Sequence, residues 1–391
     1  MKHITRTIWI LSLISLLQDM SSEMLYPVLP IYLSSIGFSV MLIGILEGMA
    51  EATVGLSKGY FGKQSDLTGK RVPFVQLGYA LSTIAKTSMV LFVHPLWVFM
   101  TRTADRLGKG IRTGARDAML SDEATKETKG KIFGFHRSLD TMGAVLGPAI
   151  ALAYLYFYPA NYKMLFFLAF IPGVFAVLIT FLLKDKPSVQ PVSVQRGNFF
   201  SYLDYWKESP ARFRKVVIGL LVFALFNSSD VFLLLRLKES GLDDTWVIGI
   251  YIFYNLVYAF CSFPLGILAD KIGLKTMYVI GLAAFAFVYV GMAIGSGWYV
   301  YLILFAVYGI YAAATEGIAK AWISNIADKK DTATAIGMYA GFQSICTLLA
   351  SSLTGIVWYS FGSATAFIST AIVTAGVIVY FLMMKNRMEV A

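Results

Sequence analysis

The stretch of sequence that decides the fold is Gly62-Lys63-Gln64-Ser65-Asp66-Leu67-Thr68-Gly69-Lys70-Arg71. A weaker copy lies 266 − 62 = 204 residues further on and reads Gly266-Ile267-Leu268-Ala269-Asp270-Lys271-Ile272-Gly273-Leu274-Lys275. After the first copy, Ser121, Lys126 and Gly134 match Ser324, Lys329 and Gly337 after the second, a shift of 324 − 121 = 203. Because the displacement stays nearly constant from residue 62 to residue 134, we expect two structural repeats with the same topology.

The composition places both repeats in a lipid bilayer. Of the 391 residues, 57% are hydrophobic and only 14% are charged, and the mean hydropathy is +0.67. Soluble domains carry roughly 25% charged residues, and a soluble fold of this size could not hide so much apolar surface. We therefore predict an all-α integral membrane protein.

Apolar stretches long enough to cross the hydrocarbon core, about 20 residues each, recur along the whole chain. Each half contains six of them, so we predict twelve transmembrane helices in two six-helix repeats. The first six are Thr7–Leu33, Val40–Gly62, Pro73–Val93, Leu96–Leu120, Phe133–Tyr156 and Tyr162–Leu183. The second six are Lys215–Leu235, Thr245–Leu268, Thr276–Ile294, Trp298–Ile323, Thr332–Trp358 and Ser363–Met384.

A long polar connector at residues 184–214 separates the two halves. We predict an N-terminal six-helix bundle over residues 1–183 and a C-terminal one over residues 215–391. Lys and Arg concentrate in alternate connections, beginning with Lys2 and Arg6 and ending with Lys385 and Arg387. By the positive-inside rule these connections, the connector and both termini are cytoplasmic. The net charge of +10 is then a topology signal of a multi-pass protein of the cytoplasmic (inner) membrane, and not a nucleic-acid-binding surface.

Both copies of the opening stretch resemble the signature Gly-x-x-x-Asp-(Arg/Lys)-x-Gly-(Arg/Lys)-(Arg/Lys) of the major facilitator superfamily, and the resemblance covers essentially the whole chain. It implies the major facilitator fold, in which two six-helix bundles rock around a central site. It also implies that the first copy acts in gating, at the cytoplasmic ends of the second and third helices. Asp66 is then expected to accept hydrogen bonds from the start of the eleventh helix, near residues 332–334. The gating motif comprises Gly62, Asp66, Gly69, Lys70, Arg71, Gly266, Asp270 and Gly273.

A second resemblance concerns the drug–proton antiporters, a bacterial group within the same superfamily. Gly143-x-x-x-Gly147-Pro148 is similar to the fifth-helix motif of that group. Ala151 and Leu152 replace the glycine pair that closes the motif. The alternative interpretation is that Gly143 and Gly147 permit two helices to pack closely.

Ionisable side chains inside the predicted spans are candidates for function. Those of the fourth span, from Arg102 to Arg116, are spaced mostly three or four residues apart and so share one face of a helix. Each charge facing lipid at mid-membrane costs roughly 2.5–3.5 kcal/mol, so this face must meet water or opposing carboxylates. The residues expected to line a substrate cavity are Arg102, Asp105, Arg106, Lys109, Arg112, Asp140, Asn227, Asp230, Asn255 and Glu316. Lys86, in the third span, has no such explanation.

Two acidic pairs are candidates for proton coupling. Asp19 and Glu23 lie one turn apart on the first span, and Glu47 and Glu51 have the same spacing on the second. Carboxylates inside the membrane are the groups that form proton relays in many transporters. The alternative is that buried charges form ion pairs that only hold helices together. We favour this alternative for the charges near the cytoplasmic ends of their helices, Arg116, Asp117 and Lys320.

Together these features predict a secondary active transporter that works by alternating access, with protons driving the export of a small anionic or zwitterionic organic solute. Uptake or exchange of an organic anion is the alternative within transport, because the cationic face would attract an anion. A membrane-embedded enzyme or sensor is the alternative of another class. The sequence has no His-Glu-x-x-His motif and no appended soluble domain to support it. We expect a monomer with no cofactor and no metal, since the three histidines are scattered.

Overall fold

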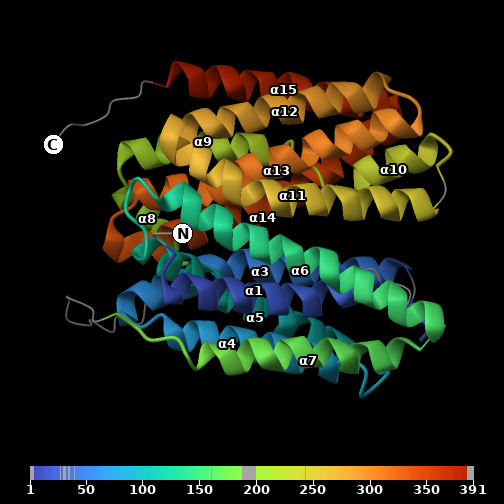
Figure 1. Cartoon of the computed structure of the whole chain (residues 1–391), viewed down its shortest axis with the longest axis horizontal. Coiled ribbons are helices and arrows are strands. Elements are labelled where there is room, and N and C mark those ends of the chain that lie inside the picture. The colour runs from blue at the N-terminus through green and yellow to red at the C-terminus, as the bar shows by residue number, and fades with distance from the viewer. Residues whose placement is uncertain are drawn as a thin grey trace.

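The computed structural model describes residues 4–26, 28–29, 32–33, 36–38, 40–159, 161–186, 200–242 and 244–384. Within these residues the chain forms helices joined by turns, and no strand is present. Figure 1 shows two bundles that lie side by side, with most of their helices running in the same direction across the view. The predicted all-helical membrane fold is confirmed.

The crossing segments of the two bundles agree in number with the predicted spans, within the described residues. The N-terminal bundle contains α1 (Arg6–Leu25), α3 (Val40–Thr68), α4 (Val72–Ser88), α5 (Pro95–Asp122), α6 (Lys129–Phe157) and α7 (Tyr162–Thr180). The C-terminal bundle contains α9 (Ala211–Ala224) with α10 (Val231–Glu239), α11 (Asp244–Ile272), α12 (Leu274–Ile294), α13 (Trp298–Ile326), α14 (Thr332–Phe361) and α15 (Ser363–Met383). Three short elements accompany them, namely η1 (Ser201–Asp204), α8 (Tyr205–Glu208) and η2 (Lys329–Asp331).

The predicted internal repeat appears directly in the helix boundaries. The shift from α3 to α11 is 244 − 40 = 204 residues at the start and 272 − 68 = 204 at the end. From α6 to α14 it is 332 − 129 = 203 residues at the start. The end of the bundles that holds residues 62–71 is called the motif end below. In Figure 1 it is the left end, where α8 lies.

Apolar side chains cover the outer faces of the bundles, as lipid requires. Eight described helices are long and apolar enough to cross a membrane by themselves. The remaining crossings depart from that pattern because α4 has only 17 residues, α3 and α5 carry charged residues, and the seventh crossing is divided. Exposed large apolar side chains on α7, α12 and α15 include Phe167, Phe175, Phe287, Ile372 and Leu382.

The seventh crossing differs from its prediction as one continuous span from Lys215 to Leu235. Helix α9 ends at Ala224 and α10 begins only at Val231. The intervening residues include the run Asn227-Ser228-Ser229-Asp230. Side chains of these types form hydrogen bonds with nearby main-chain groups, which competes with the helix. The apolar residues on both sides concealed this break from a search for long hydrophobic stretches.

Part of the polar connector folds against the motif end. Residues 187–199 lie outside the described residues, so the predicted connector is seen only at its two ends. Tyr202 in η1 is buried, and its ring packs against Gly59 of α3. Lys63 Nζ donates a hydrogen bond to the Ser201 carbonyl oxygen at 2.7 Å. Helix α9 begins at Ala211, four residues (215 − 211) before the predicted start.

Two seams of glycines join the bundles near the motif end. In the first seam α3 packs on α14, and a methyl group on Gly62 would lie 2.5 Å from the Ala333 carbonyl oxygen. A methyl group on Gly341 would lie 2.6 Å from the Gly55 carbonyl oxygen. These distances are too short for a real side chain, so the two helices meet through their main chains.

The second seam, between α6 and α11, repeats this geometry. A methyl group on Gly134 would lie 2.5 Å from the Ser262 carbonyl oxygen and 3.0 Å from the Gly266 Cα. A methyl group on Gly130 would lie 2.7 Å from the Gly266 carbonyl oxygen. Each seam therefore brings one helix of the N-terminal bundle into main-chain contact with one helix of the C-terminal bundle.

We predict that Gly62→Ala opens the first seam, because overpacking of this kind typically costs about 1–3 kcal/mol. The measurement is the rate of maleimide labelling of Ser344→Cys, which faces Gly55 across the seam, with Cys261 and Cys346 replaced by serine. Labelling should accelerate about tenfold for each 1.4 kcal/mol. Gly376→Ala on α15 is the matched control, because no atom lies within 4 Å of its added methyl group. Equal labelling rates in both variants would contradict the role of the seam.

Candidate functional site

A cavity of about 670 Å³ lies between the two bundles. Its lining comes from both bundles and reaches Tyr26, a half-exposed residue just beyond the end of α1. Helix α1 begins near the motif end, so Tyr26 lies toward the opposite end of the molecule. None of the glycines of the two seams is among the lining residues. The cavity is thus reached from the end opposite the motif, while the seams close the motif end.

Helix α5 supplies the basic wall of the cavity. Arg102, Arg106, Lys109 and Arg112 all line it, as their spacing along one helix face predicted. Asp105, on the same face, lies 3.4 Å from Arg102 Nη1 and 3.9 Å from Arg106 Nε. One carboxylate therefore compensates two of the four bases.

The other two bases of this wall, Arg112 and Lys109, differ in the contacts that they make with neighbouring residues. The Arg112 guanidinium stacks over the Tyr79 ring, 4.4 Å from its centroid, and donates to Ser82 Oγ at 3.0 Å. Lys109 is exposed and makes no hydrogen bond or ion pair with any described residue. Lys109 is accordingly a base of this wall that can reach a solute.

The first predicted acidic pair also faces the cavity. Asp19 and Glu23 of α1 line it, and neither makes a hydrogen bond or an ion pair within the described part of the chain. A proton or a cationic group could therefore reach either carboxylate. The side chains of the reserve pair, Glu47 and Glu51 on α3, lie outside the described residues.

Lys86, which the sequence left unexplained, is a further lining residue. It sits on α4 with only 4% of its surface exposed and turns inward to the cavity. Its Nζ donates to Ser21 Oγ at 3.1 Å and to Ser22 Oγ at 2.8 Å on α1. The sequence did contain a signal for this position, because Lys86 is an isolated base in an otherwise uncharged span. Such a base must turn away from lipid and toward the interior of the bundle.

The opposite wall, from the C-terminal bundle, carries only acidic charge. Asp230 and Glu316 line it together with Asn227 and the ring of Tyr251. The N-terminal wall holds five bases and three carboxylates, a balance of 5 − 3 = +2, whereas the C-terminal wall has a balance of −2. The bases are Lys86, Arg102, Arg106, Lys109 and Arg112, and the carboxylates of the N-terminal wall are Asp19, Glu23 and Asp105. The cavity is electrically polarised from one bundle to the other.

Two residues expected in the cavity lie outside its lining. Asn255 is buried on α11 and donates to the Tyr251 carbonyl oxygen at 3.0 Å, one helical turn away. Asp140 belongs to a smaller pocket lined by residues of α5, α6 and α13. Spacing along a helix cannot show which of two neighbouring spaces a side chain enters.

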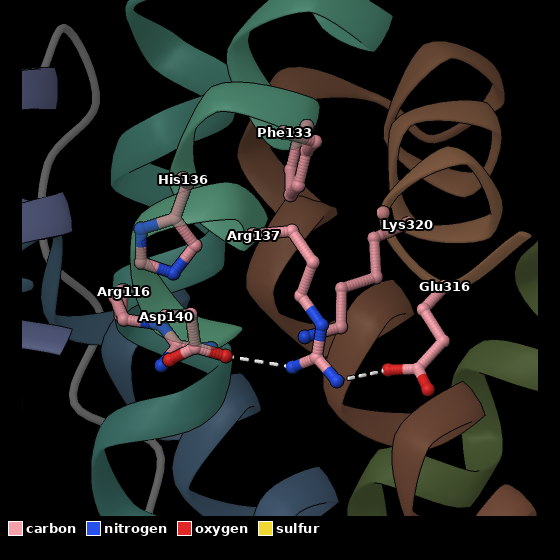
Figure 2. Close-up of a pocket in the computed structure, with 8 residues that line it drawn as sticks. Arg116, Phe133, His136, Arg137, Asp140, Glu316 and Lys320 are labelled. Atoms are coloured by element: carbon pink, nitrogen blue, oxygen red, sulfur yellow. Dashed lines mark hydrogen bonds and ion pairs between the residues drawn. The ribbon is translucent and has the colours of Figure 1, made fainter. Parts of the chain in front are cut away.

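Figure 2 shows that smaller pocket, where Arg137 of α6 lies between two carboxylates. Arg137 pairs with Asp140 on its own helix at 2.6 Å and with Glu316 on α13 of the other bundle. It also donates to the Tyr258 hydroxyl on α11, and Ser15 of α1 donates to Asp140. Glu316 lines both this pocket and the large cavity. The Arg137–Glu316 pair consequently links the floor of the cavity to the contact between the bundles.

A second ion-pair group lies beside the first. Asp117, which is fully buried on α5, forms ion pairs with Arg116 at 2.8 Å and with Lys320 of α13 at 2.7 Å. Arg116 also donates to Ser15 at 3.2 Å. These contacts hold α5 against α13 and agree with the structural role that we favoured for the three charges.

Asp66 of the repeated motif makes the contact that the sequence predicted. Its carboxylate accepts from the Thr334 main-chain nitrogen at 2.7 Å, from Thr334 Oγ1 at 2.8 Å and from the Ala333 nitrogen at 3.3 Å. These groups are the free donors at the start of α14, where the helix dipole also favours a negative charge. Arg71 lies 3.3 Å from the same carboxylate. Gly69, within the motif, has a φ of 62°, a conformation that suits glycine in a tight turn.

Asp270 reproduces this contact in the second repeat. Its carboxylate accepts from the main-chain nitrogens of Gly130 and Lys131, each at 2.7 Å, at the start of α6. Asp66 of the N-terminal bundle therefore binds a helix of the C-terminal bundle, and Asp270 does the reverse. Both contacts adjoin the glycine seams.

The glycines of the antiporter-like motif are packing residues in this structure. A methyl group on Gly143 would lie 2.9 Å from the Met20 nitrogen and 3.0 Å from the Asp19 Cβ. A methyl group on Gly147 would lie 2.6 Å from the Met20 carbonyl oxygen. These glycines let α6 approach α1 at the level of Asp19.

Comparisons with known proteins agree with this architecture. The family model described as Major Facilitator Superfamily matches residues 11–254 and 237–390. The chain is 32% identical over 381 residues to an uncharacterized MFS-type transporter of Methanocaldococcus jannaschii, with 94% of each chain covered. It is 26% identical over 274 residues to the Staphyloferrin B transporter of Staphylococcus aureus, covering 66% of this chain and 64% of that one. Its fold is similar to that of the human organic anion transporter MFSD10 (TETRAN), with a TM-score of 0.81, 14% identity, and 96% and 99% of the chains covered.

We predict that Asp66→Asn weakens closure of the motif end while the protein still folds. The amide keeps the size of the side chain but loses its charge, and hydrogen bonds to charged groups contribute about 1.5–3 kcal/mol each. Labelling of Ser344→Cys should therefore accelerate and solute flux should fall. Glu127→Gln, a carboxylate neutralised on the exposed turn before α6, is the matched control. Flux and labelling at control levels in Asp66→Asn would remove the gating role.

Proposed function

The chain belongs to the major facilitator superfamily, a family of transporters and not of enzymes, and from this premise we propose that it exchanges a zwitterionic organic solute for protons by alternating access. The observation that carries this proposal is that bases and carboxylates without ion-pair partners line one cavity between the bundles. Its basic wall suits the acidic group of a solute, and its carboxylates suit an ammonium group. A cavity of about 670 Å³ is in the usual range for a small-molecule site.

The direction of the cavity follows from the side on which the motif lies. We place the motif end in the cytoplasm, because the basic residues that gather in its connections follow the positive-inside rule. Both termini are then cytoplasmic, and the protein spans the cytoplasmic (inner) membrane. The structure on this assignment is outward-facing, with the cavity reached from outside.

Lys109 and Arg106 are proposed to hold the acidic group of the solute. Lys109 makes no hydrogen bond or ion pair within the described residues, and Arg106 presents a planar fork that matches a carboxylate or phosphate. Asp19 and Glu23 line the same cavity and are proposed to receive the ammonium group. Since each chain encloses a complete cavity, we propose that the monomer is the working unit.

Competition for Asp19 and Glu23 gives the exchange its direction. A proton and an ammonium group cannot occupy one carboxylate together, so binding of the solute releases protons. Protons that enter from outside would displace the solute from the outward-facing cavity, which amounts to export. The membership of the drug–proton-antiporter group that the fifth-helix motif suggested remains a prediction, because Gly143 and Gly147 have a packing role.

Uptake of a purely anionic solute is the second candidate, and the same wall favours it. An anion beside Asp19 and Glu23 binds better when these carboxylates are protonated, because protonation removes like-charge repulsion. Anion and proton would then bind together and move in the same direction. The two candidates therefore predict opposite effects of pH on binding.

The first prediction of this proposal concerns Lys109. A thermal-shift screen against organic acids and amino acids identifies a solute, because a bound ligand raises the apparent stability. Lys109→Gln should then weaken its binding by about tenfold or more, since hydrogen bonds to charged groups contribute about 1.5–3 kcal/mol. Lys163→Gln, an exposed lysine on α7 outside the cavity, should bind like the unmodified protein. Unchanged binding and flux in Lys109→Gln would exclude the anionic subsite.

The second prediction concerns the sign of the pH dependence. Under proton exchange the affinity for the solute increases as pH rises, because deprotonation frees Asp19 and Glu23 for the ammonium group. Calorimetric titration of the solute across pH checks this sign, and flux into proteoliposomes with an imposed pH gradient checks the coupling. Asp19→Asn with Glu23→Gln should flatten the dependence and abolish gradient-driven accumulation, while counterflow persists. An affinity that falls as pH rises would establish the anion-uptake candidate in place of exchange.

A further inference from the structure

The break in the seventh crossing exposes main-chain oxygens to the cavity wall. Between α9 and α10 the chain is not helical, and Asn227, Ser228, Ser229 and Asp230 all line the cavity. Within the described part of the chain, no main-chain nitrogen donates to the carbonyl oxygens of residues 224–228. The carbonyl end of α9 also carries the negative end of its helix dipole.

Side-chain oxygens without partners accompany these carbonyls. Ser228 is only 3% exposed, and its Oγ makes no hydrogen bond of normal length and angle within the described residues. Asn227 donates from Nδ2 to the Tyr311 hydroxyl at 3.0 Å, but its buried Oδ1 accepts nothing. The Tyr289 hydroxyl faces Ser228 and likewise makes no hydrogen bond of normal length and angle within the described residues. Unsatisfied buried polar atoms are rare in native proteins and call for a ligand, an ion or water.

The charge at this break has no basic partner. Asp230 accepts from the Tyr308 hydroxyl at 2.7 Å, and no Lys, Arg or His of the described residues forms an ion pair with it. Asp230 thus lies among neutral oxygens, with a second carboxylate, Glu316, on the same wall and no described base in ion-pair contact. No group of three His, Cys, Asp or Glu side chains that could hold a metal ion occurs in the described ranges. The other oxygens of the break, from Asn227, Ser228 and the main chain, are uncharged.

We propose that the break between α9 and α10 is a sodium site, held by the Asp230 carboxylate, Asn227 Oδ1, Ser228 Oγ and the free carbonyl oxygens that end α9. Oxygen donors suit hard cations, and one carboxylate balances one positive charge. Unwound main chain at the end of a half-helix is a known way for membrane proteins to coordinate Na⁺. This site requires neither the solute nor the proton exchange proposed above, so it goes beyond that function.

A bound ion would also fix the joint between the two half-helices. The Ser229 nitrogen donates to Ser351 Oγ of α14 at 3.1 Å, which ties the break to the helix that forms the first seam. Sodium at the break thereby orders the cavity wall and the neighbouring helix together. The ion would stabilise the folded protein by mass action.

The test uses the purified full chain in detergent without any organic solute. Its melting temperature is followed in NaCl, KCl and choline chloride at equal ionic strength, and binding of radioactive ²²Na⁺ is counted by scintillation proximity. We expect a saturable rise in melting temperature with NaCl alone, and one Na⁺ bound per chain. Asp230→Asn should abolish both effects. Ser228→Ala should lower the Na⁺ affinity by about tenfold, the scale on which single supporting groups affect metal sites.

Glu316→Gln is the matched control, because it neutralises the other carboxylate of the same wall and should retain Na⁺ binding. If Asp230→Asn does not fold, Ser228→Ala decides the question alone. Equal melting temperatures in the three salts without saturable ²²Na⁺ binding would overturn the site, as would Na⁺ binding unchanged in Ser228→Ala. Stabilisation by organic amines but not by Na⁺ would also overturn it and assign the break to the ammonium group of the solute. Failure of the exchange proposal would leave all these outcomes unaffected.

Discussion

At the motif end, Gly62 and Gly134 bring two pairs of helices into main-chain contact, with no room for a side chain between them. The other features of this end depend on that approach. Only when α3 meets α14 can Asp66 reach the start of α14, and only when α6 meets α11 can Asp270 reach the start of α6. Because such contacts either fit or do not, the seams define one of two discrete states and not a graded opening.

The closed seams explain how so many charges can lie at the depth of the bilayer. Facing lipid, each would cost roughly 2.5–3.5 kcal/mol, and the cavity walls hold ten of them (five bases and five carboxylates). Some are compensated in pairs, as Asp105 is by Arg102 and Arg106, while Lys109 and Asp19 form no ion pair within the described residues and face the cavity. The cavity and its charge therefore follow from keeping one end shut while the other stays open.

Sequence reasoning reached the repeat, the twelve crossings and the basic face of α5, because each of these is written in the order of residues along the chain. It reached the contact of Asp66 through the resemblance to the superfamily signature. It missed features that depend on how helices face each other. The Arg137–Glu316 pair joins residues 316 − 137 = 179 positions apart, and nothing in either span points to the other. The contacts of Lys86 with Ser21 and Ser22 of α1 were missed for the same reason, because they join two different helices. The break before Val231 was hidden because short polar residues interrupt an otherwise apolar span.

The most direct test of this account is the distance between the bundles at both ends, measured by electron spin resonance on the protein in lipid nanodiscs. Labels on Lys70→Cys and Lys330→Cys report the motif end, and labels on Lys163→Cys and Thr365→Cys report the opposite end; all four positions are exposed. We predict two populations whose distances change in opposite directions, so that any condition that separates the labels at the motif end brings those at the opposite end together. Distances that vary independently at the two ends, or a single fixed distance at each end under every solute and pH, would contradict alternating access around the glycine seams.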